Sequence, residues 1–355
     1  MSHIKRIVLA IALLIVVAAS ASAIWVYRDL HTPVKHTKHG QFVEIPRGSS
    51  PATVVNKLAD EGIIKHKLPL TLYLKFTSTG SQLKAGEYDF PSPISPLGVF
   101  ARLREGEQRL LRLTVIEGWT RWDIANAMSK IPELNLPEPT SALPLMENVS
   151  LISDLDPTAT NLEGYLFPDT YDFPPDTKPT EVIAMMVKRF RKEWKPDWSE
   201  RARSLNLTPR EAVTIASLVE TEAKLTEDRP LISSVIHNRL RQQIPLAVDS
   251  TVIYASKLAG KWRNDGKVYK SDVDRRSPYN TRLHAGLPPG PIAAAGKSSL
   301  EAALFPAQTD YLYYVREPSR NDGKHNFYSN GNDFARGVQA LRDWEQQQRV
   351  NDASK

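Results

Sequence analysis

The sequence predicts a mixed α+β protein carried behind one N-terminal transmembrane helix. Three observations support this prediction: an apolar run near the N-terminus, a short strand–turn–helix pattern that occurs twice, and a later helix with strong start signals and one acidic residue on its apolar face. The chain has 355 residues, of which 41% are hydrophobic. Because single cores usually stop growing near ~250 residues, this length allows two or three domains.

The apolar run predicts a membrane anchor. Lys5 and Arg6 precede residues 7–27, in which almost every residue is apolar. About 20 apolar residues span a bilayer as a helix, and basic residues before the run place the N-terminus in the cytoplasm. We therefore predict an anchor over residues 1–28, with the remainder outside the cytoplasm, and a polar linker over residues 29–40.

A cleaved signal peptide is the alternative to an anchor. Ala21-Ser22-Ala23 has the small-residue pattern of a signal-peptidase site. The apolar run is longer than the roughly 7–15 residues of a signal-peptide core, which favours retention of the helix.

The composition and the absence of several motifs exclude some classes of partner and of catalytic chemistry. The chain has 46 Lys and Arg against 40 Asp and Glu, and the charges do not form long blocks, so no nucleic-acid partner is expected. The absence of Cys excludes disulfides, thiolate catalysis and zinc–thiolate sites. No metal-ligand spacing, phosphate loop or Gly-x-Ser-x-Gly elbow occurs, so we expect neither metal nor cofactor.

A strand–turn–helix pattern occurs twice between residues 41 and 131. Residues 42–45 alternate as a strand, Gly48 supplies a turn, and Ser50 can cap a helix with Val54, Val55 and Leu58 on its apolar face. The second copy has a strand at 113–116, then Gly118, Thr120 and the apolar series Ile124, Ala125 and Met128. We predict one module over 41–131, with a further strand at 86–90. The module either binds glycan or spaces the following domain from the membrane.

The rest of the chain divides by composition. Residues 132–160 are rich in Pro, Asn, Ser and Glu and predict a connecting loop. Residues 161–345 form the predicted catalytic domain, including an amphipathic helix at 181–194, and residues 346–355 form a tail.

The helix after Thr208 carries the candidate catalytic acid. Thr208, Pro209 and Glu211 give an N-cap, a Pro at the first helical position and a capping box. The apolar face comprises Ala212, Val213, Ile215, Ala216, Val219 and Ala223, and Glu220 falls within it. Glu222 points to a different face. Burial would raise the pKa of Glu220 and let it donate a proton to a glycosidic oxygen. Pairing with Arg239 or another cation is the alternative.

Six ordered motifs resemble the YceG-like (MltG) endolytic murein transglycosylases. They lie between residues 160 and 330 and read Leu162-Glu-Gly-Tyr-Leu-Phe-Pro-Asp-Thr-Tyr171, Ala216-Ser-Leu-Val-Glu-Thr-Glu222, Val235-Ile-His-Asn-Arg-Leu240, Asp249-Ser-Thr-Val-Ile-Tyr254, Tyr279-Asn-Thr281 with Gly286-Leu-Pro-Pro-Gly-Pro-Ile292, and Tyr311-Leu-Tyr-Tyr-Val315 followed by Gly323-Lys-His-Asn-Phe327. Two positions depart from the family pattern: Ser250 replaces an expected Pro, and Arg282 an expected Tyr.

The resemblance implies an activity and an architecture. Members cleave the bond between N-acetylmuramic acid and N-acetylglucosamine inside peptidoglycan strands and leave 1,6-anhydro ends, which would limit the length of nascent strands. They carry a membrane helix, a LysM-like α/β module and a mixed α+β catalytic domain with the catalytic Glu on a helix that borders a groove. By this match Glu220 is the catalytic residue, and cell-wall synthases are candidate partners.

The other motif residues are expected to line that groove. Tyr165, Tyr254 and Tyr279 offer flat faces to sugar rings, and Asn238 and Asn280 can bond to N-acetyl groups. The same expectation covers Glu163, Asp249, Thr251, Pro288, Gly290 and His325. For the turn around Pro288 and for His325, a purely structural role is the alternative.

Two other functions remain open from the sequence. One is a non-catalytic peptidoglycan-binding scaffold that recruits cell-wall synthases. The other is a hydrolytic muramidase in which Asp249 acts as a second carboxylate.

Overall fold

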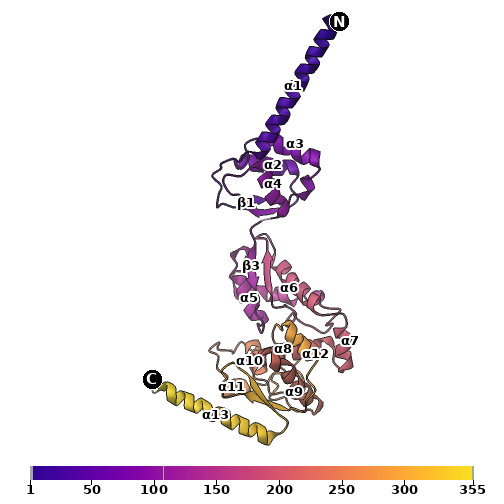
Figure 1. Cartoon of the computed structure of the whole chain (residues 1–355). Coiled ribbons are helices and arrows are strands. Elements are labelled where there is room, and N and C mark those ends of the chain that lie inside the picture. The colour runs from indigo at the N-terminus through magenta and orange to yellow at the C-terminus, as the bar shows by residue number, and fades with distance from the viewer. Residues whose placement is uncertain (1–2, 107, 354–355) are drawn as a thin grey trace. The chain divides into compact units, whose positions relative to one another are not determined.

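The computed structural model describes residues 3–106 and 108–353 (Figure 1). The chain forms two compact units, one of residues 1–111 with 172–177 and the other of residues 112–171 with 178–355. Both contain helices and short antiparallel strands, so the α+β prediction is confirmed.

The N-terminal helix α1 (His3–His31) contains the predicted apolar run. Its stretch Lys5–His31 is long and apolar enough to cross a membrane. The far end of α1 belongs to the first unit, because Leu30 is buried in its core and the Asp29 carboxylate lies 2.6 Å from Nδ1 of His66. Helix α1 therefore runs without a break from the apolar run into the folded unit.

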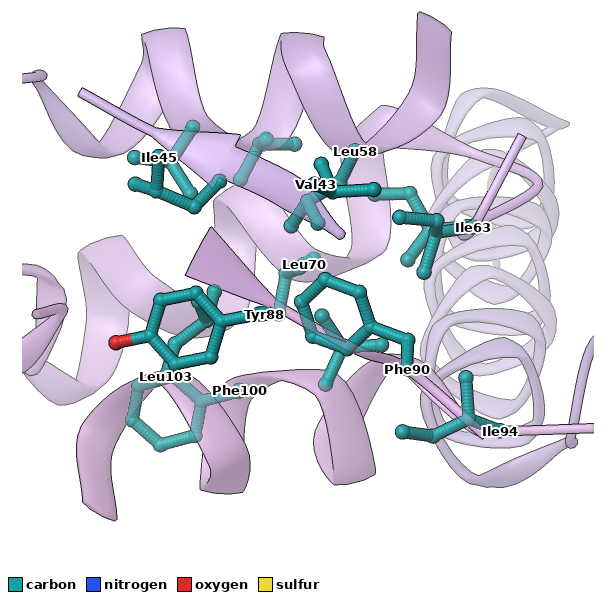
Figure 2. Packing of buried hydrophobic residues seen from close by; sticks show 14 of the residues in the cluster. Val43, Ile45, Leu58, Ile63, Leu70, Tyr88, Phe90, Ile94, Phe100 and Leu103 are labelled. Atoms are coloured by element: carbon teal, nitrogen blue, oxygen red, sulfur yellow. The ribbon is translucent and has the colours of Figure 1, made fainter. Parts of the chain in front are cut away.

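The first unit has a small two-stranded sheet among helices. Its elements are β1 (Val43–Ile45), α2 (Pro51–Asp60), α3 (Lys67–Thr77), η1 (Gly80–Gln82), β2 (Gly86–Tyr88) and α4 (Pro96–Glu105). Strands β1 and β2 are antiparallel, with Val43 opposite Tyr88. Tyr88 and Phe90 stack in the core (Figure 2).

Residues 29–40 differ from the predicted linker. Val34 and Ile94 exchange backbone hydrogen bonds of 2.8 and 3.1 Å, and the backbone N–H of His36 donates to Oγ of Ser92. The segment is held because its backbone groups find partners in the folded unit, which its polar composition did not reveal.

Both copies of the strand–turn–helix pattern form, but they lie in different units. In the first, Ser50 caps α2, whose buried residues are Val54, Val55 and Leu58. In the second, Thr120 caps α5 (Arg121–Ser129) after strand β3 (Leu111–Thr114), which pairs with β4 (Thr170–Phe173). The chain passes from one unit to the other at Leu111, so the range 41–131 spans both units.

The predicted loop over 132–160 contains four short 3₁₀ helices. They are η2 (Pro132–Leu134), η3 (Pro139–Ala142), η4 (Pro144–Glu147) and η5 (Val149–Leu151). Leu134, Met146 and Ile152 are buried, so this Pro-rich segment contributes to the core instead of connecting two domains as a surface loop.

Within the second unit, α8 (Pro209–Glu222) packs against α9 (Arg229–Arg241), α10 (Asp249–Leu258) and α12 (Lys297–Leu304) (Figure 1). The others are α6 (Pro179–Glu193), α7 (Trp198–Ser204), η6 (Thr226–Asp228), α11 (Lys270–Val273), β5 (Tyr313–Arg316), β6 (His325–Tyr328) and α13 (Gly331–Ala353). Strands β5 and β6 are antiparallel. Helix α13 extends through most of the predicted tail.

Candidate active site

Helix α8 places Glu220 in the interior. The helix begins at the predicted capping box, in which the Thr208 hydroxyl accepts from Glu211 N–H and the Glu211 carboxylate accepts from Thr208 N–H. Nine consecutive residues, 212–220, are buried, and the prediction that Glu220 faces the interior is confirmed.

Two groups hold the Glu220 carboxylate. Oε1 accepts from Nη2 of Arg229 at 3.0 Å, and Oε2 accepts from the backbone N–H of Gly296 at 2.8 Å. Arg229 is itself fixed, because its Nε donates to Ser299 and its Nη1 to Thr226. A cation therefore does pair with Glu220, but it is Arg229.

Arg239, the cation considered from the sequence, lies elsewhere. Its guanidinium donates to the carbonyl oxygens of Leu312, Pro245 and Leu246.

A second carboxylate, Glu117, joins this pair. Its Oε2 lies 3.6 Å from Nη2 of Arg229, and its side chain is 51% exposed. Partial burial has the largest effect on the pKa of Glu117 and raises it. The negative charge of Glu220 raises this pKa further, while Arg229 lowers it. Two carboxylates thus share one guanidinium.

Backbone pairing brings Glu117 to this position. Gly118 N–H donates to the Ala294 carbonyl at 2.8 Å, and Ala294 N–H donates to the Trp119 carbonyl at 2.7 Å. A Cβ on Gly296 would overlap the Glu117 carboxylate, so the missing side chain at 296 lets the two segments approach.

Sequence reasoning missed Glu117 and Arg229. Glu117 precedes the turn glycine of the second strand–turn–helix copy, where the first copy has Arg47 before Gly48. This reversal of charge within a repeated pattern was the available signal. Arg229 had no such signal, because its partner lies on another helix.

Glu163 and Tyr254, both predicted site residues, form a second buried group. The Tyr254 hydroxyl donates to Oε2 of Glu163 at 3.1 Å, and the carboxylate also accepts from the backbone N–H of Arg121. Burial raises the pKa of Glu163 to about 7 despite these hydrogen bonds. The Tyr279 ring lies 4.9 Å from the Tyr254 ring. Glu163 thereby fixes the start of α5, which follows the Glu117 segment.

Several other predicted site residues form hydrogen bonds within the protein that give each of them a structural role. Tyr165 is buried and donates to Asp156. Asn280 is buried and donates to the Val273 and Arg275 carbonyls. Asn238 donates to the Thr309 and Tyr311 carbonyls.

Contacts within the protein also involve Thr251, Asp249 and His325. The Thr251 hydroxyl donates to the Val248 carbonyl and lies 2.9 Å from the Thr281 hydroxyl. Asp249 accepts from Nε of Arg282 at 2.8 Å, so the residue that departs from the family pattern pairs with a predicted site residue. His325 contacts the Asp228 carboxylate through Nδ1 at 3.0 Å. Ser250, the other departure, lies 2.8 Å from the Thr221 hydroxyl.

The turn that contains Pro288 and Gly290 packs against α8. Ile292 N–H donates to the Ser217 hydroxyl, and Nε of Arg210 donates to the Pro289 carbonyl. Pro288 and Gly290 are buried. The turn leads into residues 292–296, and so it positions the Gly296 N–H that holds Glu220.

Glu222 has a different environment from Glu220. It accepts from the Tyr314 hydroxyl at 2.9 Å, and burial raises its pKa. Within the described residues, no group of three or more acidic or His side chains has the geometry of a metal site. The arrangement around Glu220 is that of a buried acid with a cation, a backbone donor and a second carboxylate.

Comparisons with known proteins identify the family of the chain. The model of the YceG-like family matches residues 43–340. The endolytic murein transglycosylase of Bacillus subtilis is 35% identical over 302 residues, covering 81% of this chain and 82% of that protein. The chain therefore belongs to the YceG-like family.

Two further similarities support the assignment. The endolytic murein transglycosylase of Streptococcus pneumoniae (strain D39) is 29% identical over 365 residues, covering 95% of this chain and 65% of that protein. A 2.6 Å crystal structure of a yceG-like protein from Listeria monocytogenes has a TM-score of 0.56 and 30% sequence identity, covering 83% of this chain and 97% of that one.

The raised pKa of Glu163 predicts a pH-dependent stability. Between its ordinary pKa of 4.5 and about 7, the folded protein binds more protons at Glu163 than the unfolded chain. The free energy of unfolding therefore falls as pH rises through this window, by up to about 3 kcal/mol. We expect thermal denaturation of Glu163→Gln to lose most of this dependence. Glu147→Gln, at an exposed position, is the control, and an unchanged pH dependence in Glu163→Gln would contradict the assignment.

Proposed function

We propose that this protein is an endolytic lytic transglycosylase that cleaves the bond between N-acetylmuramic acid and N-acetylglucosamine within peptidoglycan strands and leaves 1,6-anhydro ends. Membership of the YceG-like family and the names of the related proteins support this activity. The observation that carries the assignment of the catalytic residue is the buried Glu220 carboxylate, held by Arg229 and the Gly296 N–H.

Glu220 performs both proton transfers. In the first step its protonated form donates to the glycosidic oxygen as the bond to the anomeric carbon breaks. In the second step the carboxylate accepts the proton of the C6 hydroxyl of N-acetylmuramic acid as that oxygen attacks its own anomeric carbon. The nucleophile belongs to the substrate, so proximity within the ring replaces a second nucleophilic residue.

Arg229 and Gly296 stabilise the carboxylate that the first step leaves on Glu220. Both donate to its oxygens, and their donors are fixed before substrate binds, which lowers the cost of forming this charge. The first step also requires a proton on Glu220 beforehand.

Glu117 supports the first step. Two neighbouring carboxylates resist being ionised together, so one proton is retained at a higher pH than on an isolated carboxyl group. Glu117 is half exposed and can exchange that proton with solvent, whereas Glu220 is buried. We propose Glu117 as the residue that keeps the pair protonated.

The domain assignment and location belong to the same proposal. A LysM-like module within residues 41–131 binds or positions glycan, residues 161–345 form the catalytic domain with Glu220, and α1 is a single-pass inner-membrane anchor with the remainder in the periplasm. The basic residues Lys5 and Arg6 before the apolar run support this orientation. Cell-wall synthases are the proposed partners.

The Glu220→Gln variant tests the activity. Gln keeps the shape and can still accept the Gly296 N–H bond, but it can neither donate an acidic proton nor act as a base. We expect release of anhydro-muropeptides from isolated sacculi to fall by at least ~10²-fold. Glu222→Gln on the same helix should retain activity. Equal release by Glu220→Gln and the parent would favour the non-catalytic scaffold.

Product masses from the same experiment distinguish the muramidase alternative. Hydrolysis adds one water to each cleaved bond, whereas transglycosylation does not. We expect anhydro products alone from the parent, and hydrated products would instead indicate a hydrolase.

A pH–rate profile tests the role of Glu117. Burial and the charge of Glu220 raise the pKa of Glu117, and Glu117→Gln removes this group, so the alkaline limb of kcat/KM should move to lower pH. Glu117→Asp should retain part of the effect. A uniform loss of activity at every pH, without movement of the limb, would indicate a purely structural role.

Cysteine labelling tests the orientation, because the chain contains no native Cys. Lys130, which is exposed on the second unit, is replaced by Cys in the full-length protein. We expect a membrane-impermeant maleimide to label Lys130→Cys in spheroplasts as fully as after lysis. Labelling that requires lysis would place this unit in the cytoplasm.

A further inference from the structure

A pocket of about 490 Å³ lies beside α5 and the end of α10, away from the groups that hold Glu220. Its lining includes two tryptophans, Trp122 and Trp262, and the polar residues Asp123, Asn126, Lys257 and Asn264. We infer that this pocket binds acetylated sugar rings of the glycan strand at a distance from the bond that is cleaved. The inference rests on the proposed function and adds a second binding site for the same substrate.

Trp122 is held in place by its neighbours. The Arg121 guanidinium lies 4.8 Å from the centre of its ring, and the Tyr254 ring meets it edge-on at 5.3 Å. Tyr254 is in turn fixed by its hydrogen bond to Glu163. A ring positioned before ligand binding loses little conformational entropy when a ligand packs on it.

Trp262 reaches the pocket through a turn after α10. Gly260 adopts φ +62°, a left-handed conformation that Gly tolerates best, and its N–H donates to the Lys257 carbonyl. Lys261 N–H donates to the Ser256 carbonyl at 2.9 Å, which holds the returning chain. The backbone that leads to Trp262 is therefore held by hydrogen bonds.

The polar groups suit hydroxyl and acetamido substituents. Asp123 accepts from Thr120 N–H at 2.9 Å and from Nζ of Lys257 at 3.2 Å, both through Oδ2. Burial alone would raise the pKa of Asp123, but the hydrogen bonds from Thr120 and the charge of Lys257 lower it. Asp123 stays ionised, and Oδ1 can accept from a ligand. Asn126 and Asn264 are exposed and offer amide donors and acceptors.

These groups favour a sugar over a nucleic acid. Single-stranded nucleic acids also stack on aromatic rings, but their sites follow the backbone with unpaired basic residues. Among the described residues that line this pocket, the cation is Lys257, and Asp123 neutralises it. A pyranose presents an apolar face to an aromatic ring and polar groups at its edge, which matches the two kinds of lining.

Chain geometry connects the pocket with the catalytic groups. Glu117 and Trp122 lie on one continuous segment, and five residues reach at most roughly 18 Å when fully extended. A single polysaccharide strand can therefore occupy both places at once. Sugars bound far from the scissile bond would hold the enzyme within a strand and disfavour cleavage at its end.

Binding measurements on the Glu220→Gln variant, which should not cleave the glycan, test this site. Full-length Glu220→Gln in detergent micelles is titrated by calorimetry with a peptide-free glycan tetrasaccharide and with strands several times longer. Adding Trp262→Ala should weaken binding of the long strands about tenfold, as expected for losing one aromatic ring from a sugar contact. Binding of the tetrasaccharide, which occupies the Glu220 site, should not change. Trp262→Phe should restore most of the affinity for long strands.

The matched control is Trp344→Ala, a half-buried tryptophan on α13 that lies outside this pocket. It should bind both ligands like the parent. Unchanged affinity of Trp262→Ala for long strands, or an equal loss for both lengths, would overturn the inference. So would Trp262-dependent binding of a single-stranded oligonucleotide without binding of long glycan strands. Cleavage by the Glu220-containing protein decides the proposed activity separately, so the two failures are distinguishable.

Discussion

The site depends on the contact between one buried carboxylate and one buried guanidinium. Glu220 and Arg229 come from different helices and meet at 3.0 Å in the interior of the second unit. Removing either partner would leave an uncompensated buried charge, so each requires the other. Ser299 on α12 and Thr226 fix the remaining donors of Arg229, and α8, α9 and α12 are thereby held in one arrangement around the acid.

The segment from residue 115 to 122 connects the separate parts of the site. Its backbone pairs with Ala294, which places Glu117 beside Arg229, and its end is fixed where the Glu163 carboxylate accepts a hydrogen bond from the Arg121 N–H. The same local pattern in the first unit, ending in α2, has Arg47 in place of Glu117 and contributes to a hydrophobic core. The first copy of the strand–turn–helix pattern thus contributes apolar side chains to a core, whereas the second copy carries polar groups of the site.

Local structure was predictable from the sequence where short-range rules determine it. The caps at Ser50, Thr120 and Thr208 and the interior position of Glu220 follow from neighbours within one or two turns of the chain. Long-range pairings were not predictable. The Arg229 contact, the approach of Glu117 and the burial of Tyr165 and Asn280 depend on packing between distant segments, and a motif position does not distinguish a groove residue from a core residue.

The predicted range of the module, 41–131, includes Leu111, where the chain passes from one compact unit to the other. Repetition of a pattern suggests one repeating unit, but each copy packs with the segments that cover its apolar face. Val54, Val55 and Leu58 are covered within the first unit, whereas the second copy lies beside the segments 292–296 and 161–165. The partner of an apolar face, more than the pattern itself, determines the unit to which an element belongs. The continuous path of α1 into the first unit follows the same rule, because Leu30 is apolar and is buried in the hydrophobic core of that unit.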